Sequence, residues 1–272
     1  MQLKKTQILL LSYCLFWLTS CTQKQPTTDS TEQTTNDSLS TDSTSTAVSD
    51  EDILKTIPKN IKPILGYRFM IKGDFDGDGK KENLVEHFYS SIDNKETNKF
   101  YDGLDNYEQL VALTIKKMPY SFVISDNAKL DTLSISISAQ LLGLSYLKNE
   151  GDLNGDGTDE VSYVVNWADW SNMNTWHIMT YKSNRWEELY SFPIWDWQLP
   201  DLPETFNNYG LFGLQDKVMV PEDDSVNLLI EQNMQQFKGL VKKIKNNQIQ
   251  VIFKNEEASE DTMLVDLTKK IN

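Results

Sequence analysis

Cysteine is almost absent from this sequence. The chain contains 2 cysteines, Cys14 and Cys21, and both lie near the N-terminus. The residues after Cys21 therefore have no thiol for a disulfide or a metal, which excludes thiol redox chemistry and zinc binding through cysteine. This part of the chain has to be stabilised by its hydrophobic core and by any metal that its oxygen ligands bind.

Side chains and motifs typical of catalysis are also scarce. The 2 histidines, His87 and His177, lie in runs of large apolar residues, which favours a structural role. No GxSxG, HExxH, P-loop or GxGxxG pattern is present. A non-enzymatic function is therefore expected. The alternative is a hydrolase that acts on glycans through two carboxylates that the sequence does not single out.

Basic residues are in the minority. The chain has 26 Lys and Arg residues against 40 Asp and Glu residues, and its formal net charge is -14. Binding to a phosphate backbone requires a basic face, so no nucleic acid partner is expected. Cations bound at the acidic segments described next would neutralise part of the negative charge, and the rest is expected to be solvated surface.

Two short acidic segments carry nearly the same sequence. Residues 73–82, the first loop, read GDFDGDGKKE, and residues 151–160, the second loop, read GDLNGDGTDE. Both follow the pattern D-x-[DN]-G-D-G-x-x-E. Oxygen side chains at positions 1, 3, 5 and 9 of this pattern converge on one hard cation, and the glycine at position 6 lets the backbone fold around it. The pattern predicts two calcium sites, and the second has one carboxylate fewer because Asn154 replaces Asp76.

The flanking residues indicate which class of calcium loop this is. An EF-hand requires a bidentate Glu at position 12, but Val85 and Tyr163 occupy that position here. Strand-like runs flank both loops, at 67–71, 84–89, 144–147 and 161–165. A strand, loop, strand unit with its last ligand at position 9 resembles the FG-GAP or VCBS type of repeat, which occurs in the propeller of integrin α subunits and in many bacterial surface proteins.

This resemblance implies calcium as the cofactor and a specific ligand set. In the family the side chains at positions 1, 3, 5 and 9 and the carbonyl at position 7 bind the ion. The matching residues are Asp74, Asp76, Asp78, Lys80 (carbonyl) and Glu82 in the first loop, and Asp152, Asn154, Asp156, Thr158 (carbonyl) and Glu160 in the second. The family usually has Asp at position 9, and Glu keeps the charge while it lengthens the reach. The resemblance also implies propeller-like or β-sandwich-like blades.

The N-terminus has the features of an export signal. Lys4 and Lys5 precede an apolar run over residues 8–18 that is too short to span a bilayer, and the sequence LTSC ends at Cys21. This arrangement resembles a bacterial lipobox, in which the cysteine is lipidated and becomes the first residue of the mature chain. We therefore expect a signal peptide over residues 1–20 and a lipid anchor at Cys21, in the bacterial cell envelope at the outer membrane or cell surface.

The rest of the chain divides by composition into a tether and a folded domain. Residues 21–49 are rich in Thr, Ser, Asp and Gln and have almost no large apolar residue, which predicts a disordered tether after the lipidated cysteine. Residues 50–272 are long enough to bury a sizeable core and are predicted to form a calcium-binding, mainly β domain with at most one or two short helices.

Local patterns predict the elements of this domain. A short helix is expected near residues 53–57, before Pro58. Further strands are expected at 111–115, 120–125, 133–137, 177–181, 186–190, 239–245, 248–254 and 263–267, with hairpins joining the second to the third, the fourth to the fifth and the sixth to the seventh. Residues 225–237 are compatible with either a helix or a strand.

Most of the tryptophans are clustered between residues 167 and 197. Trp176 and Trp186 fall in predicted hairpin strands and are expected to be core residues. Trp167, Trp170, Trp195 and Trp197 lie in loop-like segments beside Asp and Asn, a combination suited to hold a sugar ring or a peptide side chain. Aromatic clusters are more often core than binding site, so packing is the competing interpretation. The expected function is that of a structural or binding module with a glycan or protein ligand.

Overall fold

The structure is a computed structural model that describes residues 49–169, 171–200, 224–257 and 259–269. All described residues belong to one compact unit. The predicted signal peptide, Cys21, the predicted tether up to residue 48, and Trp170 lie outside the described residues. No described helix is long and apolar enough to cross a membrane.

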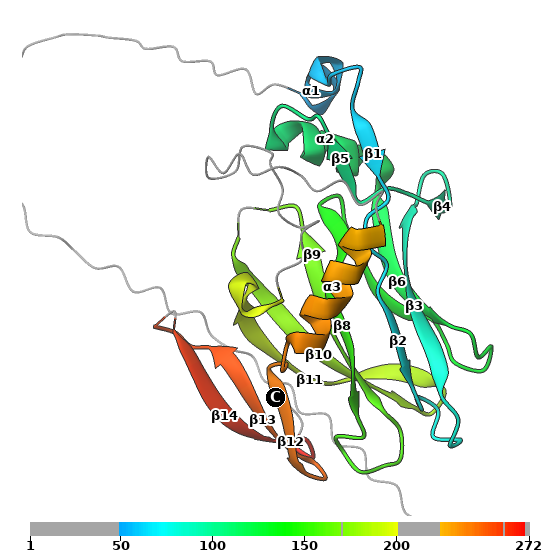
Figure 1. Cartoon of the computed structure of the whole chain (residues 1–272), viewed down its shortest axis with the longest axis vertical. Helices are drawn as coiled ribbons and strands as arrows, with labels where there is room; N and C mark the ends of the chain where they lie inside the picture. The colour runs from blue at the N-terminus through cyan, green and yellow to red at the C-terminus, as the bar shows by residue number, and fades with distance from the viewer. Residues whose placement is uncertain (1–48, 170, 201–223, 258, 270–272) are drawn as a thin grey trace, which may run out of the picture. The chain divides into compact units, whose positions relative to one another are not determined.

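Antiparallel strands make up 48% of the structure and helices 16%, which confirms the mainly β prediction (Figure 1). The strands are β1 Lys62–Ile64, β2 Met70–Gly73, β3 Glu82–Ser90, β4 Lys95–Glu96, β5 Phe100–Asp102, β6 Pro119–Ser125, β7 Leu133–Ile137, β8 Leu141–Gly151, β9 Glu160–Trp167, β10 Met173–Lys182, β11 Arg185–Trp195, β12 Val241–Lys245, β13 Gln248–Lys254 and β14 Glu260–Asp266. The predicted hairpins are present as β6 with β7, β10 with β11, and β12 with β13.

Helices are more prominent than the sequence predicted. The described residues contain the α-helices α1 Asp50–Thr56, α2 Tyr107–Lys117 and α3 Asp224–Gln236, and the short 3-10 helix η1 Asp196–Gln198. The short helix expected before Pro58 is confirmed as α1. The expectation of at most two short helices was wrong, because α2 replaces a predicted strand and α3 forms from the segment that the sequence left undecided.

Helix α2 contradicts the strand predicted at 111–115. Asn106 caps the helix by accepting a hydrogen bond from the backbone N of Gln109 at 3.0 Å. The residues that the helix buries recur at a spacing of three to four, and among them are Tyr107, Leu110 and Thr114. This longer helical period decides the structure, whereas the short alternation of apolar residues was a local coincidence.

The two acidic loops occupy equivalent places in two different sheets. The first loop joins β2 to β3, and the last pair of that hairpin is Gly73 with Glu82. The second loop joins β8 to β9, and the last pair there is Gly151 with Glu160. Strands β2 and β3 belong to a five-stranded sheet ordered β2-β3-β6-β7 with β4 beside β3, and the second hairpin belongs to a four-stranded sheet ordered β11-β10-β9-β8. The predicted strand, loop, strand context is confirmed for both loops.

The four-stranded sheet has both of its faces covered. On one face, Val161 and Val165 of β9 lie in a core shared with β3, β6 and the buried Ile230 of α3. On the other face, Val164 of β9 lies in a second core shared with the C-terminal sheet β12-β13-β14. Since neighbouring side chains of a strand point to opposite faces, most of β9 is buried. The sheets therefore pack in layers like those of a β-sandwich, and none of the described sheets closes into a barrel.

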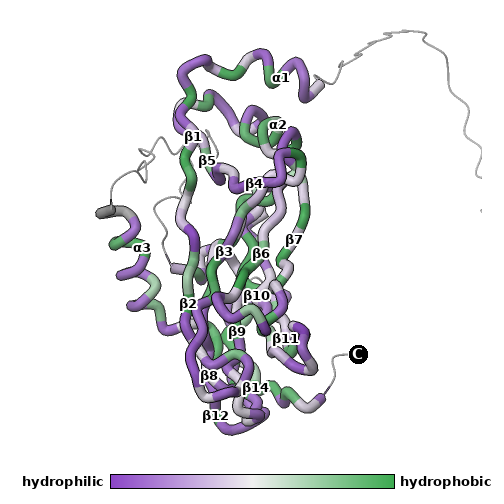
Figure 2. Tube along the Cα trace, turned by 90° about the vertical axis from the view of Figure 1, so that its right-hand side faces the viewer, coloured by the Kyte–Doolittle hydropathy of each residue, from purple (hydrophilic) through white to green (hydrophobic). Residues whose placement is uncertain are grey.

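Polar turns gather at one end of the domain. The first loop, the second loop and the turn between β12 and β13 lie together at the lower end of the view in Figure 1. In Figure 2 this end is largely hydrophilic, whereas hydrophobic and hydrophilic residues alternate along the strands and along α3. The layered core thus places the two acidic loops side by side.

Candidate metal centre

Both loops have the same turn at positions 3 to 7 of the pattern. In the first loop, Asp76 Oδ1 accepts a hydrogen bond from the N of Asp78 at 3.1 Å, and Asn154 Oδ1 of the second loop accepts one from the N of Asp156 at 2.8 Å. The glycines at position 6, Gly79 and Gly157, have φ values of 84° and 93°, a conformation that other residues rarely adopt. The two segments therefore share this turn, as their sequences predict, but they differ at the preceding glycine, because Gly151 has a φ of 72° and Gly73 does not have a positive φ.

Three carboxylates converge in the first loop. Oxygen atoms of Asp74, Asp76 and Asp78 all lie within 4.8 Å of one another. Asp74 Oδ2 accepts a hydrogen bond from the N of Gly79 at 2.9 Å, while Asp74 Oδ1 is buried and has no hydrogen-bond partner. Like charges at this spacing repel, and a buried oxygen without a partner is costly. A bound cation removes both penalties, so these residues fit a calcium ion.

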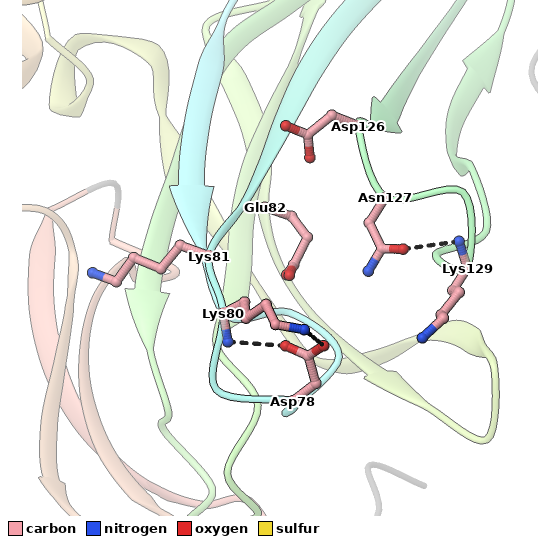
Figure 3. A pocket seen from close by; sticks show the side chains of 7 residues that line it. All are labelled: Asp78, Lys80, Lys81, Glu82, Asp126, Asn127 and Lys129. Carbon is pink, nitrogen blue, oxygen red and sulfur yellow. Dashed lines mark hydrogen bonds and ion pairs between the residues drawn. The ribbon is translucent and has the colours of Figure 1, made fainter.

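The fourth carboxylate of the first loop, Glu82, lies outside this group of three. Its side chain is buried, and Oε2 accepts a hydrogen bond from the N of Phe75 at 3.0 Å. Burial raises the pKa of the Glu82 carboxyl, and the nearby charges of Asp76 and Asp74 raise it further. A pocket beside the loop contains Glu82 (Figure 3); its lining residues are Asp78, Lys80, Lys81, Glu82, Asp126, Asn127 and Lys129.

A turn from the same sheet holds the first loop from the side. Asn127, in the turn between β6 and β7, donates a hydrogen bond from Nδ2 to Asp76 Oδ2 at 2.9 Å. Its own Oδ1 accepts from the N of Lys129 at 3.1 Å, which fixes the orientation of the amide (Figure 3). Asn127 therefore orients a carboxylate of the candidate site, and sequence pattern alone gave no signal for this role.

In the second loop, hydrogen bonds take the place of the carboxylate cluster. Asn154 Nδ2 donates to Asp156 Oδ2 and to Glu160 Oε1, both at 3.0 Å. Glu160 is fully buried, and it also accepts from the N of Leu153 at 2.6 Å and from Thr180 Oγ1 at 2.9 Å. Burial raises the pKa of the Glu160 carboxyl to about 7. The acids of this loop are therefore better satisfied by protein donors than those of the first loop.

The residue at position 7 is predicted to bind through its carbonyl in each loop. The N of Lys80 donates to Asp78 Oδ1 at 2.9 Å, and the N of Thr158 donates to Asp156 Oδ1 at 3.0 Å, so both residues hold matching places. The hydrogen bond from the Lys80 backbone lowers the pKa of Asp78. The Lys80 ammonium lies 3.2 Å from Asp78 Oδ2 but is largely exposed, so this ion pair adds little to stability.

The two loops are in direct contact. Asp159 of the second loop accepts hydrogen bonds through Oδ2 from the N of Asp74 at 3.0 Å and from Asn149 Nδ2 at 2.8 Å. The N of Asp159 donates to the carbonyl of Asp74 at 2.7 Å. A Cβ atom on Gly77 would lie 3.2 Å from the Cγ2 of Thr158. A position outside the predicted ligand set therefore bridges the two candidate sites.

The C-terminal hairpin supports the other side of the second loop. The N of Asn247 donates to the carbonyl of Leu153 at 3.1 Å, and Lys243 Nζ donates to the carbonyl of Asp152. At position 2 of the pattern, Phe75 and Leu153 are both buried in the core clusters. Each loop is thus anchored by an apolar side chain at a position that the metal pattern leaves free.

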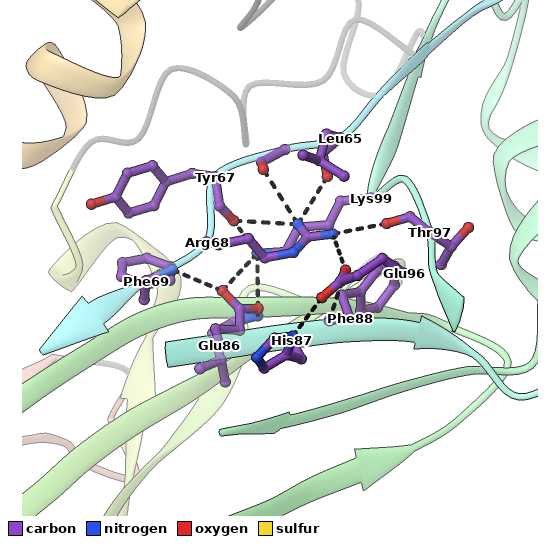
Figure 4. Close-up of polar contacts among 12 residues, drawn as sticks. Leu65, Tyr67, Arg68, Phe69, Glu86, His87, Phe88, Glu96, Thr97 and Lys99 are labelled. Carbon is purple, nitrogen blue, oxygen red and sulfur yellow. Dashed lines mark hydrogen bonds and ion pairs between the residues drawn. The ribbon is translucent and has the colours of Figure 1, made fainter. Parts of the chain in front are cut away.

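The histidines and the most deeply buried ion pair have structural roles. His87 Nδ1 lies 2.7 Å from Glu96 Oε1 (Figure 4), and His177 Nδ1 lies 2.6 Å from a carboxylate oxygen of Glu188. The Lys99 ammonium lies 2.9 Å from Glu86 Oε1, with both side chains buried. Glu86 also accepts from a backbone N in the other sheet, that of Leu144. This pair joins the two large sheets.

The tryptophans divide into core and surface residues. Trp176 is fully buried and donates from Nε1 to Ser162 Oγ at 2.9 Å, as predicted. Trp167 ends β9 and packs against the first core, so its predicted loop position was wrong. Trp195 also ends a strand, β11, and its ring stacks on that of Trp197 with centroids 4.4 Å apart. Trp197 is 61% exposed, whereas Trp195 is only partly exposed, and Lys254 Nζ lies 4.7 Å from the Trp195 ring.

Comparison with known proteins adds no family assignment. The chain matches no family model, and no curated protein and no solved structure is significantly similar to it.

Proposed function

We propose that this chain is a lipid-anchored protein of the bacterial cell envelope, at the outer membrane or cell surface, whose β domain is held together by calcium and acts as a structural or binding module. The calcium sites are the first and second loops, with the ligand sets given by the FG-GAP or VCBS resemblance. Propeller-like or β-sandwich-like blades built from such repeats belong to the same proposal. Calcium that binds only the folded chain stabilises the fold, and this stabilisation grows with the logarithm of the ratio of the free calcium concentration to Kd.

One observation carries this proposal. Asp74, Asp76 and Asp78 bring their oxygens within 4.8 Å of one another, and Asp74 Oδ1 is buried without a hydrogen-bond partner. Oxygen ligands at this density suit a hard divalent cation. The first loop is the tighter site in this account, because it offers four carboxylates where the second offers three and the amide of Asn154.

Calcium binding to the full-length chain tests the proposal. Isothermal titration calorimetry should show binding at both loops, and Asp78→Ala should remove the tighter event. Elemental analysis of dialysed protein checks that the starting material is free of metal. Binding that survives Asp78→Ala and Asp156→Ala together would place the ion elsewhere, and no binding at all would refute the proposal.

The lipid anchor has its own test. Cys21 lies outside the described residues, so this part of the proposal rests on the sequence. Cys21→Ser should leave the protein in the soluble fraction of the exported compartment, because the acyl chains supply the membrane affinity. Membrane retention of the serine variant would contradict the anchor.

A ligand platform is the second candidate function, and the exposure of Trp197 favours it. Trp197 stacks on Trp195, and the pair is suited to a flat apolar ligand face such as a sugar ring. Trp197→Ala should change the free energy of unfolding by less than about 0.5 kcal/mol, whereas Trp176→Ala should cost about 3 to 5 kcal/mol. Quenching of tryptophan fluorescence by soluble glycans that Trp197→Ala abolishes would support the platform. Turnover of those glycans would instead favour the hydrolase alternative.

A further inference from the structure

We propose that Asp159 couples the two loops, so that a cation in the second loop raises the affinity of the first. This inference rests on the proposed calcium function. It adds that the two sites act together and that one residue outside both ligand sets transmits the effect.

The position of Asp159 connects it to ligands on both sides. Within the second loop it lies between Thr158 and Glu160, both members of the proposed ligand set. Across the interface, its Oδ2 accepts from the N of Asp74 at 3.0 Å, and its N donates to the carbonyl of Asp74 at 2.7 Å. Asp74 is the first ligand of the first loop, and its Oδ1 is the buried oxygen without a partner.

This bridge is held on both sides. Asn149 of β8 donates from Nδ2 to Asp159 Oδ2 at 2.8 Å and to the carbonyl of Lys72 at 3.0 Å, so it joins the bridge to β2. A Cβ atom on Gly73 would lie 2.3 Å from Asn149 Nδ2 and 2.7 Å from Asp159 Oδ2, so only glycine fits beside it. The equivalent of Asp159 in the first loop is the exposed Lys81. The bridging carboxylate therefore belongs to the second loop.

The expected coupling is positive. Protein donors already hold the carboxylate of Glu160, and a cation in the second loop would in addition hold the carbonyl of Thr158, so that Asp159 is fixed from both sides. Asp159 then holds the backbone of Asp74 in place before the first loop binds. The first loop thus loses less conformational freedom on binding, which raises its affinity. Repulsion between the two cations acts in the opposite direction, but salt screens it between exposed sites.

A double-mutant cycle measures this coupling. Calcium chloride is titrated calorimetrically, at about 0.15 M salt, into four forms of the full-length chain: wild type, Asp156→Ala, Asp159→Ala and the double variant. With Asp159 present, disabling the second loop by Asp156→Ala should lower the calcium affinity of the first loop by about fivefold or more. In the Asp159→Ala background, Asp156→Ala should change the calcium affinity of the first loop by about twofold or less.

Controls separate coupling from a loss of folding or charge. Glu257→Ala removes one exposed charge in the turn between β13 and β14 and should leave the full coupling. Asp159→Asn keeps the shape and one acceptor oxygen, and it should retain part of the coupling. Circular dichroism of each form in calcium checks that the fold is kept. A purely structural role for Asp159 would change affinity without changing the ratio that the cycle measures.

The outcomes are distinguishable. If calcium binds but Asp156→Ala leaves the affinity of the first loop unchanged, the coupling is refuted and the calcium function stands. If coupling persists in Asp159→Ala, the role of Asp159 is refuted. If neither loop binds calcium, both the proposed function and this inference fall.

Discussion

The first and second loops share one turn but differ in side-chain chemistry. In the first, the carboxylate of Asp76 faces two other aspartates, and Asp74 Oδ1 has no partner. In the second, the amide of Asn154 fills the equivalent place and donates to both Asp156 and Glu160. One nitrogen in place of one oxygen therefore turns mutual repulsion into a hydrogen-bonded network. Two copies of one motif can therefore differ in how much of their stability depends on an ion.

The two loops therefore differ in what stabilises their shape. The second loop is supported by its own amide, by Thr180 and by the C-terminal hairpin, so it holds much of its shape without metal. The first loop brings three carboxylates together and leaves Asp74 Oδ1 without a partner, so under the proposed function it depends more on a cation. Under the proposed coupling, the bridge through Asp159 lets the second loop support the first.

The largest expected difference between the loops is the cost of removing the position 9 glutamate in metal-free protein. Glu160→Ala leaves several buried donors unpaired and should reduce the free energy of unfolding by about 3 kcal/mol or more. Glu82→Ala removes the acceptor of the hydrogen bond from the N of Phe75 and should cost about 1 kcal/mol. Urea unfolding in chelator measures both. If both variants lost the same free energy of unfolding, the hydrogen bonds to Glu160 would not stabilise the metal-free second loop.

Exchanging the position 3 residues should exchange the behaviour of the loops. Asn154→Asp adds a ligand charge, so it should tighten calcium binding at the second loop by about tenfold and lower the Tm in chelator. Asp76→Asn should weaken the first loop by about tenfold, equivalent to about 1.4 kcal/mol. Calorimetric titration checks both variants. An unchanged calcium affinity in both would refute the idea that the charge at position 3 sets the affinity.

The metal-free protein should also show a pH dependence of its stability. The pKa of Glu160 is raised from 4.5 in the unfolded chain to about 7 in the folded one, so the folded state binds this proton more tightly. The contribution to stability is full below pH 4.5 and is lost as the pH rises through about 7. Urea unfolding between these values, in chelator, should show this loss, and Glu160→Gln should reduce it. An unchanged pH profile in Glu160→Gln would assign the effect to other groups.

Local chemistry made the loops and the hairpins predictable. The spacing of Asp74, Asp76 and Asp78 specifies a converging group, and the glycines at position 6 specify the backbone that allows it. Helix α2 was missed because a short apolar alternation was given more weight than the capping Asn106 and the longer helical period. Both signals were present in the sequence.

Contacts between distant segments were not predictable in this way. Asp159 and Asp74 meet because two sheets pack against each other, and no spacing within either loop encodes that register. The same holds for Asn127, which reaches Asp76 from another turn. The stacking of Trp195 on Trp197 and the burial of Trp167 also depend on the ends of β11 and β9, which sequence patterns place poorly.

Thermal unfolding of the full-length chain with and without calcium tests the central claim most directly. At about a hundredfold excess over Kd, calcium should add about 3 kcal/mol per tight site to the stability of the wild type. Asp78→Ala should remove most of this calcium-dependent increase in Tm, and Asp156→Ala should remove the smaller part. The same Tm in calcium and in excess chelator, with the protein confirmed free of metal by elemental analysis, would contradict the account.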